Sequence, residues 1–94
     1  MTAKTNNSHS QWHVCGMVAQ CHPKDIAAVK TALSALTLTE VSAVDEQNGK
    51  LAVVMESSSQ ADLLERMEQA RDIDGVLALS LVYHQQDQDN LVGE

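Results

Sequence analysis

The stretch Glu40-Val-Ser-Ala-Val-Asp-Glu-Gln-Asn-Gly-Lys-Leu-Ala-Val-Val-Met-Glu56 decides the fold of this 94-residue chain. Two short runs, residues 40–46 and 50–56, flank a Gln-Asn-Gly segment. Asn-Gly between alternating runs predicts a β-hairpin, because both residues tolerate a positive φ. A hairpin therefore lies in the middle of the chain, and the patterns on its two sides decide what it joins.

The two halves of the chain share one order of elements. A β-prone run over 12–20 precedes a helical pattern from about 23 to 36, with apolar residues three or four positions apart. In the second half, Ser59 and Asp62 resemble a capping box that opens a helix, and the apolar run 76–85 follows. Two strand–helix–strand units joined by a hairpin predict an α+β, ferredoxin-like βαββαβ sandwich. Its four-stranded antiparallel sheet carries both helices on one face.

Length and composition limit the domain organisation. We expect a polar N-terminal tail over 1–11, one domain over 12–85 and a polar, acidic tail over 86–94. The whole chain is too short for a two-domain enzyme. Hydrophobic residues make up 44% of the chain, too many for a disordered protein. No apolar run approaches the roughly 20 residues that span a bilayer. The start of the chain lacks the apolar core of a secretory signal, so we expect a cytoplasmic protein.

The net charge indicates the kind of partner. Six basic residues against thirteen acidic ones give a formal net charge of −7 at neutral pH. Such a surface repels phosphate groups, so neither nucleic acid nor a membrane surface is an expected partner. A basic partner is attracted instead.

Alternation along the strands predicts which side chains face the helices. In the last strand, the bulky set Leu77, Leu79, Leu81 and Tyr83 is expected to fill the core. No element of the chain is left to cover the opposite face of the sheet. The side chains expected on that uncovered face are mostly small and apolar: Val14, Gly16, Val18, Val44, Ala52, Val54, Ala78, Ser80, Val82 and His84.

Carboxylates are expected at the border of the same face. In this register Glu40, Glu46 and Glu56 lie at strand ends on the uncovered side and form an acidic rim. An apolar floor with an acidic rim suits a partner that is both apolar and basic. Association of two copies through this face, as a weak homodimer, is the alternative.

No motif for catalysis or metal binding stands out. Cys15 and Cys21 are six residues apart, which is neither redox-pair nor zinc-ligand spacing, and His13 and His22 nearby complete no usual ligand set. His84 has no placed carboxylate or nucleophile beside it. We therefore expect no enzyme, no catalytic residue, no metal and no cofactor. A metal carrier that uses the two cysteines stays open as a weaker alternative.

Three segments resemble the NapD family, the cytoplasmic assembly chaperones of the periplasmic nitrate reductase. They are Trp12-His-Val-Cys-Gly-Met-Val-Ala-Gln20, then residues 44–56, and finally Asp74-Gly-Val-Leu-Ala-Leu-Ser-Leu-Val-Tyr-His-Gln85. The ending Leu81-Val-Tyr-His-Gln85 is the most specific piece, and Gly16 stands where the resemblance leads us to expect Ser.

The resemblance implies a concrete function. Members of this family bind the twin-arginine signal peptide of the nitrate reductase catalytic subunit and delay its export until cofactor loading and folding are complete, without carrying a cofactor themselves. Combined with the residues above, it predicts that the peptide docks on the uncovered face, with its arginines near the acidic rim. The alternative from a different class is a ferredoxin-like regulatory domain that senses a small molecule.

Overall fold

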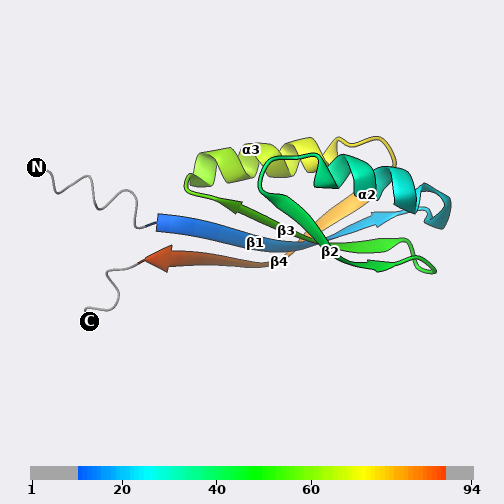
Figure 1. The fold of residues 1–94 in the computed structure, drawn as a ribbon, viewed down its shortest axis with the longest axis horizontal. Helices are drawn as coiled ribbons and strands as arrows, with labels where there is room; N and C mark the ends of the chain where they lie inside the picture. The colour runs from blue at the N-terminus through cyan, green and yellow to red at the C-terminus, as the bar shows by residue number, and fades with distance from the viewer. Residues whose placement is uncertain (1–10, 89–94) are drawn as a thin grey trace, which may run out of the picture.

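A computed structural model describes residues 11–88 and has the predicted order of elements (Figure 1). Of the tails expected over 1–11 and 86–94, residues 1–10 and 89–94 lie outside the described residues, whereas Gln11 and residues 86–88 belong to strands. The elements are β1 (Gln11–Cys21), the 3-10 helix η1 (Pro23–Asp25), α2 (Ile26–Ser34), β2 (Thr39–Asp45), β3 (Lys50–Ser57), α3 (Gln60–Arg71) and β4 (Val76–Gln88).

The four strands form one antiparallel sheet in the order β2-β3-β1-β4. The central strands are β1 and β3, and both α2 and α3 lie on the same face (Figure 1). This arrangement confirms the predicted ferredoxin-like sandwich. Among the described residues no element covers the other face, which we call the open face. No helix within residues 11–88 is long and apolar enough to cross a bilayer.

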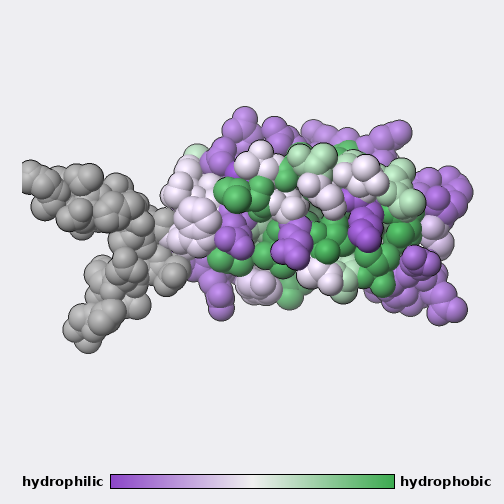
Figure 2. Space-filling model, viewed as in Figure 1, coloured by the Kyte–Doolittle hydropathy of each residue, from purple (hydrophilic) through white to green (hydrophobic). Residues whose placement is uncertain are grey.

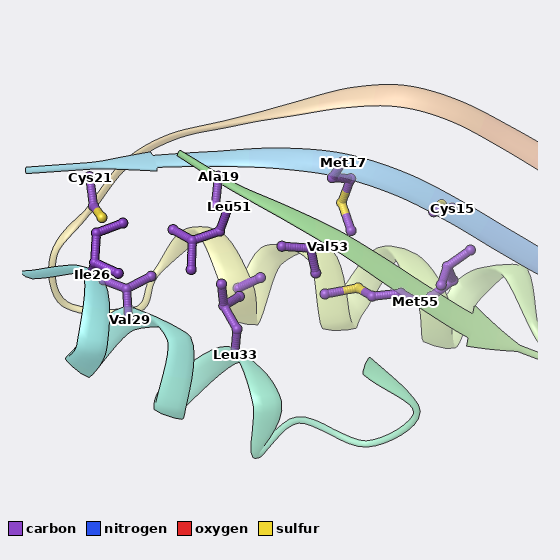
Figure 3. Packing of buried hydrophobic residues seen from close by; sticks show 12 residues of the cluster. Cys15, Met17, Ala19, Cys21, Ile26, Val29, Leu33, Leu51, Val53 and Met55 are labelled. Atoms are coloured by element: carbon purple, nitrogen blue, oxygen red, sulfur yellow. The ribbon is translucent and has the colours of Figure 1, made fainter. Parts of the chain in front are cut away.

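The core lies between the sheet and the helices. Alternate side chains of β1 and β3 point toward α2, as Met17, Ala19 and Val53 do in Figure 3. Since strand side chains alternate between the faces, the residues between them point to the open face. The buried core consists of Cys15, Met17, Ala19, Cys21, Ile26, Val29, Leu33, Leu51, Val53, Met55, Leu63 and Ala70.

The helix boundaries follow local chemistry. Pro23 begins a 3-10 turn, and α2 then ends at Ser34, two residues before the predicted end. Ser59 caps α3 as predicted, because its hydroxyl accepts the Asp62 backbone N–H at 3.2 Å.

The hairpin between β2 and β3 is confirmed, but its turn is longer than a two-residue Asn-Gly turn. It spans Glu46–Gly49, and only Gly49 has a positive φ, of 67°. Asn48 donates its backbone N–H and its side-chain amide to the Asp45 carboxylate, at 3.2 and 2.9 Å, and these bonds lower the Asp45 pKa. A Cβ at Gly49 would collide with the Cys21 carbonyl, so glycine is required here for space as well as for φ.

Candidate functional site: the open face of the sheet

The central strands place their predicted residues on the open face. In the antiparallel pairing, Val18 lies opposite Ala52 of β3 and Ser80 of β4, and Gly16 lies opposite Val54. Directly paired residues share a face, and these alternate with the buried core residues. The structure brings the following predicted residues together on or at the border of the open face: Val14, Gly16, Val18, Ala52, Val54, Ala78, Ser80 and Val82.

Val44 was predicted on the open face, and that prediction is wrong. A bulge between Val41 and Ala43 inserts one unpaired residue into β2. Beyond it Ala43 lies opposite Ala52, while Val44 lies opposite the buried Leu51 and packs against the core. The bulge reverses the alternation, so Ala43 takes the place on the open face that the sequence pattern gave to Val44.

The predictions for His84 and Tyr83 are also wrong, because a second bulge shifts the alternation of β4. Met17 pairs with Leu81 but Gly16 pairs with Tyr83, which leaves Val82 as the extra residue of β4. His84 consequently lies opposite Cys15 on the helix side, with its Nε2 atom 3.1 Å from Nδ1 of the buried His13. Tyr83, predicted for the core, lies over Gly16 on the open face.

The predicted leucine core of β4 holds only in part. Leu79 packs against the core, but Leu77 and Leu81 are 61% and 54% exposed. β4 is an edge strand, and a further irregularity between Gln20 and Cys21 leaves Leu77 unpaired. Figure 2 shows the molecule in the same view as Figure 1. Hydrophobic residues reach the surface there in an interrupted band below the hydrophilic outer surface of the helices.

An apolar depression of about 240 Å³, which we call the hollow, lies at the centre of the open face. The ring of Tyr83 lies directly over Gly16, which is buried beneath it, and the floor is low at Ala52, whose side chain is a single methyl group. Around this floor stand the side chains of Val18, Val54, Val82 and Tyr83, with Ser42 on the β2 side. Shape and composition suit an apolar group rather than a charged one.

Two of the three predicted rim carboxylates lie together. Glu40 lies opposite Val54, and Glu56 is two residues further along β3 on the same face. They border a notch of about 250 Å³, the acidic notch, which Leu38, Thr39 and Val54 complete. Glu46 lies in the hairpin turn at the other end of β2 and so is not part of this cluster.

Glu56 is held from both faces of the sheet. On the open face, Trp12 Nε1 donates to Glu56 Oε1 at 3.0 Å. On the helix side, the guanidinium of Arg66, only 6% exposed, donates to the Glu56 carbonyl and to the Asp62 carboxylate, both at 2.7 Å. The spacing of Asp62 and Arg66 on one helix was visible in the sequence, but the burial of Arg66 and its bond to Glu56 were not.

The cysteines belong to the core rather than to a site. Cys15 and Cys21 are buried free thiols on the helix side. Burial raises the pKa of both, and the Asp25 carboxylate raises that of Cys21 further. Within the described part of the chain, His, Cys, Asp and Glu form no group of three that could hold a metal ion.

The family model described as NapD protein matches residues 12–88, almost the whole described chain. This chain belongs to the NapD family. The match includes both strands that carry the hollow's Gly16 and Tyr83 as well as the hairpin that carries the acidic notch.

Curated relatives agree with this assignment. The chain is 52% identical over 79 residues to Chaperone NapD of Haemophilus influenzae, covering 84% of this chain and 85% of that protein. It is 40% identical over 80 residues to Chaperone NapD of Escherichia coli K12, covering 85% and 92%. The solution structure of the E. coli Tat proofreading chaperone protein NapD matches with a TM-score of 0.77 at 40% identity, over 84% of this chain and 83% of that one. NapD proteins are chaperones, so the predicted non-enzymatic chaperone role is confirmed.

Proposed function

We propose that this NapD-family protein binds the twin-arginine signal peptide of the periplasmic nitrate reductase catalytic subunit and delays its export until cofactor loading and folding are complete. The proofreading role in the name of the E. coli relative supports the class of partner. The observation that carries the proposal is the pairing of an apolar hollow with an acidic notch on a face that no described element covers.

The peptide docks across β3, β1 and β4 as a short apolar helix. Side chains as small as those of Ala52 and Ser80 let a helix approach the sheet closely beside the Tyr83 ring, and removal of apolar area from water supplies most of the affinity. Its arginines reach Glu40 and Glu56, where charge-assisted hydrogen bonds fix the direction of the peptide.

Retention of the precursor follows from occupancy. While the signal lies on the sheet, its arginines and apolar residues contact the chaperone and cannot contact the export machinery. Export then requires release, and the chaperone acts in the cytoplasm, where the precursor is assembled.

A second copy of the chain is a weaker occupant of the open face. Two faces packed together by a twofold axis would bury two sets of carboxylates from chains that each carry a net charge of −7. A basic peptide removes this repulsion.

A chemical-shift map tests the proposal directly. We would titrate the 15N-labelled protein with the twin-arginine peptide of its own organism's nitrate reductase, and with a matched peptide whose two arginines are glutamines. We expect shifts at Gly16, Val18, Ala52, Val54 and Ser80 with the native peptide, and weaker binding of the glutamine peptide. Shifts confined to the outer surface of α2 and α3, or equal binding of the two peptides, would refute the proposal.

A further inference from the structure

The hollow and the acidic notch meet at one side chain. Val54 lines both: Glu40 and Glu56 lie on its notch side, and Gly16 and Ala52 lie on its hollow side. A single bound segment can therefore place a charged group in one depression and an apolar group in the other. Neighbouring strands are about 4.8 Å apart, close to the roughly 5–6 Å between side chains one turn apart on a helix.

The β4 bulge builds one wall of the hollow. The extra residue, Val82, turns Tyr83 away from the core and over Gly16. With regular alternation Tyr83 would face the helices, and this part of the sheet would be flat. Bulges commonly re-aim a side chain next to a functional site.

Gly16 sets how low the Tyr83 ring lies. A Cβ built on Gly16 would collide with the ring atoms of Tyr83, so any larger residue would displace the ring. The ring nevertheless leaves Tyr83 43% exposed, and its free surface lines the hollow. Tyrosine offers a large, rigid contact surface of the kind that dominates binding energy at interfaces.

We propose that the hollow is an anchor pocket for one bulky apolar side chain of the signal peptide, and that Tyr83 and Gly16 determine which side chain fits. The selected residue lies one helical turn from the arginine that enters the acidic notch. This inference rests on the proposed function and adds to it the spacing that the chaperone reads: an arginine and a bulky apolar residue three or four positions apart.

The test is a double-mutant cycle by isothermal titration calorimetry. The protein variants are Tyr83→Ala, which removes the ring, and Gly16→Val, whose side chain takes the space under the ring and displaces it. Leu81→Ala is the matched control, because Leu81 is a similarly exposed side chain of the same strand on the helix side. The peptides are the native twin-arginine peptide and versions with each apolar residue changed singly to alanine. Thermal unfolding checks that each variant is folded.

We expect Tyr83→Ala and Gly16→Val each to weaken binding of the native peptide at least about tenfold, and Leu81→Ala to leave it within about twofold. One peptide variant has alanine in place of the apolar residue one helical turn from an arginine. For this peptide, Tyr83→Ala should cause no further loss of affinity. If the loss of affinity from Tyr83→Ala adds to the loss from the alanine change at every peptide position, the anchor pocket is overturned while the proposed function stays intact. Failure of the unmodified protein to bind the native peptide would overturn both.

Discussion

Arg66 holds the backbone of Glu56 from the side of the sheet opposite to the Glu56 carboxylate. Its Nη1 donates to the Glu56 carbonyl at 2.7 Å from within the helix layer, while the carboxylate accepts from Trp12 on the open face. The same guanidinium pairs with Asp62 of α3 at 2.7 Å. The helix layer therefore fixes the end of β3 that carries one of the two notch carboxylates.

Arg66→Met should weaken both the fold and peptide binding. The change leaves the Glu56 carbonyl without its charged donor, and we expect a loss of about 1–3 kcal/mol in the free energy of unfolding. Peptide affinity should fall as Glu56 loses its fixed position. Urea unfolding and calorimetry measure the two effects, with the exposed Arg71→Met as the matched control. A stably folded Arg66→Met protein with unchanged affinity would show that Glu56 needs no support from α3.

Peptide binding should weaken as salt is added, because arginine–carboxylate contacts at the border of a site are screened over about 8 Å at physiological ionic strength. Glu40→Gln and Glu56→Gln should each lower the affinity and flatten this dependence. Glu46→Gln makes the same charge change at the hairpin turn and should do neither. If binding is independent of salt, or if Glu46→Gln lowers the affinity most, the peptide arginines do not bind at the acidic notch.

Ser80→Trp should block the open face without unfolding the protein. Ser80 is exposed opposite Val18, so the change is expected to alter the free energy of unfolding by about 0.5 kcal/mol or less. The indole would occupy the floor and prevent a helix from reaching it. The control, Leu81→Trp, adds the same group one residue away on the helix side and should bind peptide normally. Calorimetric titration of both variants measures the effect on peptide affinity. If Leu81→Trp blocks binding and Ser80→Trp does not, the site is not on the open face.

Both cysteines should be dispensable for peptide binding. Cys15 and Cys21 point away from the open face, and burial raises the pKa of their thiols, which keeps them protonated and unreactive at neutral pH. The Cys15→Ala/Cys21→Ala protein should bind peptide with unchanged affinity once it is folded. In the unmodified protein, a thiol reagent such as DTNB should react only after denaturant is added. Loss of binding in a fully folded double variant would revive the metal or redox alternative.

The sequence by itself determined the order and sidedness of the central elements. Met17 and Ala19 alternate with Gly16 and Val18, and the capping residue Ser59 marks the start of α3. These signals are local: each depends on the few residues around it, on backbone geometry and on the contrast between apolar and polar side chains. The family segments lie on β1, on the β2–β3 hairpin and on β4, and they could be recognised before the structure because they are continuous stretches of sequence.

Only the tertiary structure decided the edges of the site. One extra residue in β2 and one in β4 reverse the alternation beyond them, moving Val44 and His84 to the helix side and Tyr83 to the open face. A bulge leaves no mark in a strand whose residues are apolar on both faces, because its position depends on how one strand pairs with its neighbour. The burial of Arg66 is likewise set by where α3 crosses the end of β3. The hollow and the notch are shaped by pairing and packing between residues that are far apart in the sequence. Local sequence patterns therefore cannot predict them.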